Sequence, residues 1–250
     1  MKMMDKLFNR PLTLIKTHDF CAAKTPKLTV VLIHGIASDS STCARALQYL
    51  EGTTSLKDVR FVTFDLLGSG KSLKSDELNY DYKEQVEALH NAILKLKLDT
   101  PLVLVGHSLG TFIVTRYADT YKKSVKRLIL VSPPVYTPED LENPAFKKGI
   151  KVFEAAVSAK NPSYLKEKAF QNSMQKIVLN KKNYKTLAEL KTPATLIYGD
   201  ADQFIGAPNI PKLVAENPKY LNAIKTTGRH GVSRDKYSKM VEILEGMLNA

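Results

Sequence analysis

Short apolar runs rich in β-branched residues recur along the chain and alternate with longer amphipathic stretches. Such continuous runs suit parallel strands that are buried on both faces, whereas the stretches between them have helical spacing. The runs occupy residues 28–35, 59–68, 101–108, 125–133, 193–200 and 220–228, of which the last is the weakest. This alternation predicts βαβ units and an α/β domain whose mostly parallel, doubly wound sheet carries helices on both faces.

The helical pattern is clearest at residues 82–98, 111–121 and 234–248. Residues 11–20 precede the first apolar run and have a strand-like composition. Mixed sheets often carry one antiparallel strand at an edge, so we predict an antiparallel edge strand there.

One segment, residues 134–192, interrupts the alternation because it contains no good strand pattern. It is rich in Lys, Glu, Ala and Asn with scattered large apolar residues, which predicts several short helices. An insert of this length is more often a functional lid than a structureless loop. We therefore expect a core of residues 1–133 and 193–250 with a helical cap of residues 134–192; a purely structural subdomain is the alternative.

Composition excludes several classes of protein. No stretch reaches eighteen consecutive apolar residues, so we expect no membrane-spanning helix, and the start of the chain lacks the apolar core of a signal peptide. The two cysteines, Cys21 and Cys43, belong to no CxxC or Cys–His pattern. This excludes a disulfide framework and a cysteine zinc site, and it fits a reducing cytoplasm.

The formal charge of +12 comes from 37 basic and 25 acidic side chains. Such an excess can indicate nucleic acid or an anionic surface as a partner. Here it consists mostly of scattered lysines, without zinc-finger spacing, an RNP-type motif or a long basic run. We therefore expect a solvated lysine-rich surface, no nucleic-acid partner, no metal site and no cofactor.

The motif with the clearest chemistry is Gly106-His107-Ser108-Leu109-Gly110, between an apolar run and a helical pattern. The pattern GxSxG places a serine on a sharp strand-to-helix turn, where the flanking glycines avoid steric clashes. The hydroxyl of Ser108 is then exposed, and the backbone N–H of Leu109 points into the same space. This predicts Ser108 as a nucleophile.

A serine nucleophile needs a base, and His230 is the candidate among five histidines. It lies in a glycine-flanked loop after the last apolar run, and loops at the carboxyl ends of strands hold the sites of open α/β sheets. His107 should point away from its neighbour on so tight a turn, and a structural role suits His34 better. His18 and His90 are interpreted as surface residues.

The base in turn needs a carboxylate that orients it, and two candidates follow the run 193–200, namely Asp200 and Asp202. Either one gives the chain order Ser, Asp, His, which is the order of α/β-hydrolases and differs from the orders of chymotrypsin and subtilisin. The residues alone leave the choice between the two open.

Two further motifs accompany the serine motif. His34-Gly35-Ile36 ends an apolar run, and residues 65–72 read D-x-x-G-x-G-x-S. With the serine motif, they make the sequence resemble the α/β-hydrolase superfamily over nearly its whole length. The resemblance implies the α/β-hydrolase fold with about eight strands and an inserted cap. It also implies that the carboxylate is Asp202, three residues after the glycine that ends the strand, whereas Asp200 is a turn residue.

The donors of the oxyanion hole can be predicted as well. Stabilising a tetrahedral intermediate requires donors aimed at its developing negative oxygen. The backbone N–H of Leu109 is one, and the resemblance implies the backbone N–H of Ile36, after His-Gly, as the second. The two side chains can also line an acyl pocket.

Other chemistries fit less well. Residues 68–72 look like the tail of a phosphate-binding loop, but the glycine required five residues before Gly70 is Asp65. Asp65 is better explained as a brace for that loop, and Lys71 as a surface residue. Haloalkane dehalogenases and epoxide hydrolases of this fold use an Asp nucleophile, where this chain has Ser108.

The sequence therefore predicts a serine hydrolase, a carboxylesterase that cleaves a small-molecule ester through an acyl-enzyme. A carbon–carbon bond hydrolase of a ring-cleavage product is the nearest alternative, because it uses the same triad and a similar cap. A monoacylglycerol-type lipase is equally hard to separate. A small-molecule receptor of the same fold, with slow or absent turnover, is the alternative outside enzymes.

Overall fold

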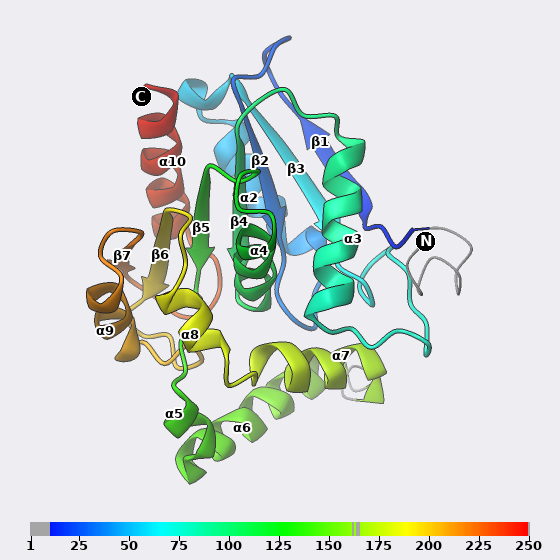
Figure 1. The fold of residues 1–250 in the computed structure, drawn as a ribbon, viewed down its shortest axis with the longest axis vertical. Coiled ribbons are helices and arrows are strands. Elements are labelled where there is room, and N and C mark those ends of the chain that lie inside the picture. The colour runs from blue at the N-terminus through cyan, green and yellow to red at the C-terminus, as the bar shows by residue number, and fades with distance from the viewer. Residues whose placement is uncertain (1–10, 162, 164–165, 250) are drawn as a thin grey trace.

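The protein is described by a computed structural model that covers residues 11–161, 163 and 166–249. Within these residues the chain forms one sheet with the strand order β1-β3-β2-β4-β5-β6-β7 (Figure 1). The strands are β1 Ile15–Phe20, β2 Leu28–Ile33, β3 Val59–Asp65, β4 Leu102–His107, β5 Arg127–Val131, β6 Ala194–Gly199 and β7 Leu221–Thr226. All six apolar runs are strands, which confirms the α/β fold class.

The described residues hold seven strands, where about eight were expected. The eighth was implied by the family resemblance and not by any apolar run, and residues 1–10 lie outside the described part. Strand β1 is antiparallel to β3 at one edge of the sheet, as predicted, and all other neighbours are parallel. At the opposite edge, the exposed middle of β7 explains why its apolar pattern is the weakest.

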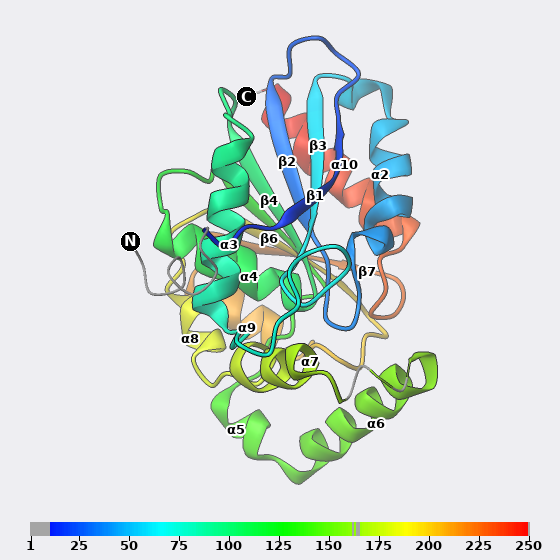
Figure 2. The same cartoon turned by 90° about the vertical axis from the view of Figure 1, so that its right-hand side faces the viewer.

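Helices cover both faces of the sheet, as Figure 2 shows from its edge. On one face lie α2 (Ala44–Glu51) and α10 (Arg234–Leu248), whose apolar side chains share a buried cluster with the facing strand residues. On the other face α3 (Tyr82–Lys95), α4 (Leu109–Thr120) and α9 (Asn209–Glu216) do the same. Two short 3-10 helices, Ser40–Cys43 and Thr54–Leu56, flank α2.

Between β5 and β6 the described residues form helices and no strand. These are α5 Pro138–Glu142, α6 Pro144–Lys160, α7 Lys168–Ser173, a π-helical turn Met174–Val178 and α8 Asn183–Ala188. Figure 1 shows α5, α6 and α7 beyond the carboxyl ends of the parallel strands. This is the end of the sheet at which an open α/β fold places its site.

The two halves of this segment differ in their packing. Phe170, Ile177 and Leu187, from α7 to α8, belong to the same buried cluster as α3 and α4. Along α6, by contrast, Val157 is the only buried residue. The segment therefore has no core of its own: its second half is built into the main core, and α6 lies mostly outside it.

The described part of the chain contains no helix that combines the length and the apolarity needed to cross a bilayer.

Candidate active site

Ser108 lies between the end of β4 and the start of α4, with φ of 52° and ψ of −119°. A positive φ is uncommon for a residue other than glycine, and such strain is typical of functional turns. The two motif glycines allow the chain to turn here. A Cβ on Gly106 would lie 2.5 Å from the carbonyl carbon of Gly110, and one on Gly110 would lie 2.5 Å from the carbonyl oxygen of Ile33.

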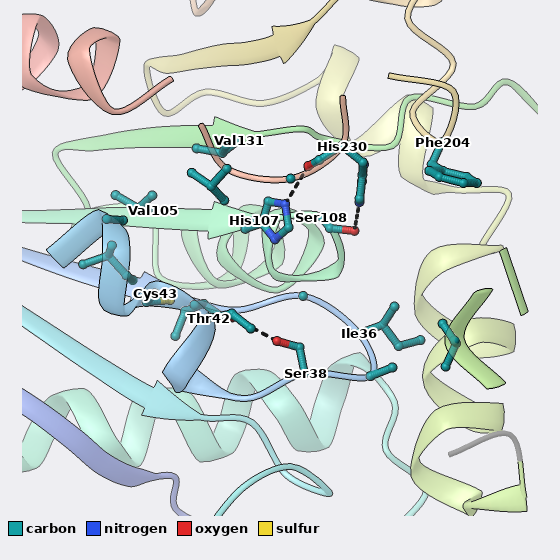
Figure 3. A pocket seen from close by; sticks show the side chains of 18 of the residues that line it. Ile36, Ser38, Thr42, Cys43, Val105, His107, Ser108, Val131, Phe204 and His230 are labelled. Atoms are coloured by element: carbon teal, nitrogen blue, oxygen red, sulfur yellow. Dashed lines mark hydrogen bonds between the residues drawn. The ribbon is translucent and has the colours of Figure 1, made fainter. Parts of the chain in front are cut away.

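A chain of hydrogen bonds connects Ser108 with two residues distant in sequence. The Nε2 atom of His230 is 2.9 Å from Ser108 Oγ. Its Nδ1 atom is 3.0 Å from Oδ2 and 3.1 Å from Oδ1 of Asp202. The structure thus brings together the three residues predicted as nucleophile, base and orienting acid (Figure 3 shows Ser108 and His230).

Asp202 is held as an anion. Burial of its side chain would raise its pKa, but the hydrogen bond and the charge of His230 outweigh that effect and lower the pKa. The backbone N–H of Phe204 adds a hydrogen bond of 3.0 Å to Oδ1. A buried carboxylate fixed in this way selects the imidazole tautomer that carries a proton on Nδ1, leaving Nε2 to face Ser108.

Asp200 is directed elsewhere. Its Oδ1 accepts a hydrogen bond of 3.0 Å from the backbone N–H of Gly228, in the loop that precedes His230. It therefore acts as a local turn residue, and its side chain is exposed.

The other histidines have structural contacts. His34 is buried, its Nε2 accepts from the N–H of Leu66 at 3.0 Å, and its Nδ1 lies 2.8 Å from the carbonyl oxygen of Gly35. His18 pairs with Glu51. The interpretation of His90 as a surface residue holds only in part, because its half-buried ring stacks on the aromatic residue that directly follows α4. That neighbour is Tyr121, at a centroid distance of 3.8 Å.

Asp65 braces the loop that follows β3. Its carboxylate accepts hydrogen bonds from the backbone N–H groups of Ser40 at 2.9 Å and Lys71 at 2.8 Å, while the Lys71 side chain is exposed. A Cβ on Gly70 would lie 2.1 Å from Asp65 Oδ2, so the loop is closed over this carboxylate and offers no phosphate cradle.

The two amides predicted for the oxyanion hole flank Ser108. Leu109 is the first residue of α4, and Ile36 follows Gly35, where an added Cβ would lie 3.2 Å from Ser108 Cβ. Among the described residues, neither the N–H of Ile36 nor that of Leu109 has a hydrogen-bond partner in the fold. Both donors are thus available to a ligand.

An apolar cavity of about 460 Å³ opens beside Ser108 and His230. Its inner part runs behind His107 between the sheet and the helices α2 and α10, where Cys43, Val105 and Val131 line it (Figure 3). Its outer part is lined by α6 and by Phe204. Burial raises the pKa of the Cys43 thiol to about 12, so this cysteine contributes apolar surface and not a thiolate.

No group of three or more His, Cys, Asp or Glu side chains that could hold a metal ion occurs in residues 11–161, 163 and 166–249.

One charged residue at the site was not predicted from the sequence, namely Lys236 of α10, which is fully buried beside the His230 loop. A signal for it exists, because Lys236 shares its helix face with Met240 and Leu244, four and eight residues later, both of which are buried.

The ring of His107 lines the cavity, and its Nε2–H donates a hydrogen bond of 3.0 Å to the carbonyl oxygen of His230. Burial lowers the pKa of His107 to about 4, aided by the nearby charge of His230. In an unfolded chain a histidine titrates near about 6.5. The unfolded state therefore takes up the proton first, and stability is complete above about pH 6.5 and lost as the pH falls towards 4.

We expect the free energy of unfolding to fall by up to about 1.4 kcal/mol per pH unit across this window through His107. His107→Gln, which keeps a donor for the His230 carbonyl, should give a shallower fall. Urea unfolding of both proteins at pH 7 and pH 5 measures the difference. An equal loss of stability in the two proteins would contradict the assignment of a neutral ring to His107.

Comparisons with known proteins concern the family and the fold of the chain. A family model described as alpha/beta hydrolase fold matches residues 29–163. "Probable lysophospholipase BODYGUARD 5" of Arabidopsis thaliana is 34% identical over 119 residues, which are 47% of this chain and 27% of that protein. "Lipase 1" of Psychrobacter immobilis is 27% identical over 206 residues, which are 70% of this chain and 62% of that protein. The chain thus matches less than two thirds of the length of either relative.

Among solved structures, a bromoperoxidase from Bacillus anthracis has a TM-score of 0.72 and 21% identity, with 95% of each chain covered. A likeness at this identity concerns the fold and not the reaction. The family model, in contrast, spans more than half of the sequence. The chain therefore belongs to the α/β-hydrolase fold family.

Proposed function

We propose that the protein is a serine hydrolase that cleaves a small carboxylic ester through an acyl-enzyme. The observation that carries this proposal is the continuous hydrogen-bonded chain from Ser108 through His230 to Asp202 at the wall of an apolar cavity. A serine hydroxyl becomes an effective nucleophile when a base lies within hydrogen-bond reach and a third group orients that base.

In this mechanism Ser108 Oγ attacks the ester carbonyl while His230 Nε2 takes its proton. The N–H groups of Ile36 and Leu109 bind the oxyanion that develops, and Asp202 stabilises the imidazolium. His230 then gives the proton to the leaving alcohol. A water molecule, activated by the same imidazole, attacks the acyl-enzyme and releases the acid.

The surroundings of the site support an ester with an apolar acyl group. The cavity beside Ser108 is mainly apolar, and the segment 134–192, our proposed cap, contributes Phe153, Ala156 and Val157 of α6 to its outer wall. The names of two relatives, a lysophospholipase and a lipase, point to the same class of substrate. Both cysteines are free thiols, which supports a reducing, cytoplasmic setting.

Hydrolysis of p-nitrophenyl esters from acetate to laurate tests the proposal. We expect multiple turnovers, with a best acyl length that reflects the size of the cavity. In parallel, a fluorophosphonate should label the protein once, and peptide mass spectrometry should locate the label on Ser108. Turnover with no label on Ser108 would contradict the mechanism.

Absence of turnover on every ester, from folded protein, would overturn the esterase proposal. Release of a cleaved product from a vinylogous diketone acid would then identify a carbon–carbon bond hydrolase. Tight binding of a small molecule without product would identify a receptor of this fold.

The inner part of the cavity should set the acyl chain length. Ala46, buried on α2, lines it, so Ala46→Leu should shorten the space available to the chain. We expect the ratio of laurate to acetate kcat/KM to fall about tenfold or more, since even one methylene can alter selectivity by that factor. Ala44→Leu, at an exposed position of the same helix, is the matched control and should leave the ratio unchanged. An equal ratio in both variants would place the acyl chain outside this part of the cavity.

A further inference from the structure

Lys236 of α10 is fully buried, which is unusual for a lysine. Its ammonium group donates three hydrogen bonds, one for each of its hydrogens. They reach the carbonyl oxygen of Arg229 at 2.7 Å, the carbonyl oxygen of Gly231 at 2.8 Å and Ser132 Oγ at 2.8 Å. Two of the three acceptors are therefore the residues immediately before and after His230.

The loop that carries His230 is held along its whole length. The carbonyl oxygen of Gly228 accepts from the N–H of Ala201 at 3.1 Å, and the next three carbonyls accept from side chains of other elements. Those three belong to Arg229, His230 and Gly231; the outer two bind Lys236, and the middle one binds His107 Nε2 at 3.0 Å. The four successive carbonyl groups of this stretch are therefore all bonded within the fold.

Such a set of contacts has a physical cost. Removing an ammonium from water is expensive, and the cost is recovered only where its hydrogen bonds are complete. The loop itself includes Gly228, with φ of 107°, and Gly231, so its sequence offers little stiffness of its own. A base has to be held to within about 0.5 Å of its working position, which a rigid clamp provides and a glycine-rich loop does not.

The charges around Lys236 come from several elements. Asp202, on the loop after β6, and Asp235, on α10, oppose the effect of burial, which lowers the pKa of Lys236. His107 on β4 and His230 on its loop complete the titratable groups nearby. The cation therefore lies in the same electrostatic environment as the Asp202–His230 pair.

We propose that Lys236 is a positioning residue that clamps the His230 loop, with Ser132 and His107, and so holds the imidazole in line with Ser108. This inference rests on the proposed serine hydrolase function. It predicts that the charge and the three donors of Lys236 matter for the chemical step, although the side chain touches neither substrate nor Ser108.

Lys236→Met keeps the length of the side chain but removes its charge and its donors. We expect kcat to fall tenfold to a hundredfold, roughly the effect of displacing a reacting group by 1 Å, with little change in KM. Loss of the positive charge also favours protonation of the His230–Asp202 pair. The acid limb of the kcat/KM profile should therefore move to higher pH by about half a unit or more.

Lys239→Met is the matched control, because Lys239 lies on the same helix and pairs with Glu242 at the surface. It should leave kcat and the pH profile unchanged. Ser132→Ala removes one of the three acceptors and should give a smaller loss of kcat in a protein that stays folded. If circular dichroism shows that Lys236→Met does not fold, the proposal is tested by comparing kcat of Ser132→Ala with kcat of the control Lys239→Met. Equal values would then contradict the clamp.

A second measurement does not depend on turnover. Hydrogen exchange followed by mass spectrometry should show faster exchange in residues 228–233 of Lys236→Met, and to a lesser degree of Ser132→Ala, than in Lys239→Met. If exchange there is unchanged, the clamp is refuted, even where activity falls. If hydrolysis proves independent of Ser108, the proposed function fails, and the exchange data still decide whether Lys236 holds the loop.

Discussion

Ser108→Ala is expected to lower kcat/KM for p-nitrophenyl esters by roughly 10⁴- to 10⁶-fold. The Ser108 hydroxyl oxygen forms the bond of the acyl-enzyme. In the proposed mechanism no other nucleophile lies within hydrogen-bond reach of His230. The fold should persist, because alanine is only slightly smaller than serine and the substitution removes a single side-chain hydrogen bond. The measurement is a comparison of kcat/KM for the wild type and for Ser108→Ala, with the variant purified free of wild-type protein.

Ser38→Ala is the matched control for this variant. Ser38 also lines the cavity, but its hydroxyl bonds Thr42 Oγ1 at 2.9 Å and lies in no chain with His230 (Figure 3). It should retain turnover within a few-fold of wild type. Comparable rates for Ser108→Ala and Ser38→Ala would show that Ser108 is not the nucleophile.

Asp202→Asn is expected to reduce kcat by about 10⁴-fold. The amide keeps the shape of the carboxylate but can donate to His230 Nδ1, which stabilises the tautomer with its proton on Nε2. That tautomer faces Ser108 with a donor and cannot accept the hydroxyl proton. The loss should appear in kcat, and the residual rate should rise with pH as hydroxide replaces the missing base.

Asp200→Asn tests the choice between the two carboxylates of the same loop. Asp200 is exposed and accepts from the N–H of Gly228, a bond that the asparagine oxygen can keep. Near-wild-type kcat is expected for this variant. A larger loss from Asp200→Asn than from Asp202→Asn would reverse the assignment.

Much of the fold could be predicted from the sequence because buried parallel strands leave a strong signal. Strands β2 and β6 are buried at every position, and their runs are continuous in the sequence. The residues alone indicate seven strands, namely the six apolar runs and the edge strand β1, which is mostly exposed and has a weaker pattern. The eighth strand came from the resemblance, which carries no local information about this chain.

Some residues of the site could be predicted from the sequence itself, and one could be predicted only from the family resemblance. Ser108 stands out because a sharp turn demands glycines at fixed positions, and His230 because it lies in a loop at the correct end of the sheet. Nothing in the residues themselves separates Asp200 from Asp202, since both follow the same strand; only the family pattern distinguished them. Their roles in catalysis stay predictions until the variants are measured.

Lys236 escaped prediction for a different reason. A lysine in a charged amphipathic helix is normally solvated, and the surplus of lysines in this chain made that interpretation natural. Its partners are two backbone carbonyls of a loop and the hydroxyl of Ser132, which have no sequence signature. Its spacing from Met240 and Leu244 indicates an inward-facing position, but only the three-dimensional arrangement reveals what its ammonium group binds.

The uneven packing of the segment between β5 and β6 bears on how such a protein can diversify. Helix α6 buries only Val157 yet contributes Phe153, Ala156, Val157 and Lys160 to the cavity wall. Mutations there can reshape selectivity at little cost in stability, because surface substitutions are mostly neutral. Changes in α7 and α8 would instead disturb the shared core. New substrate preferences should therefore arise first along α6, and a library confined to this helix is the shortest route to altered specificity.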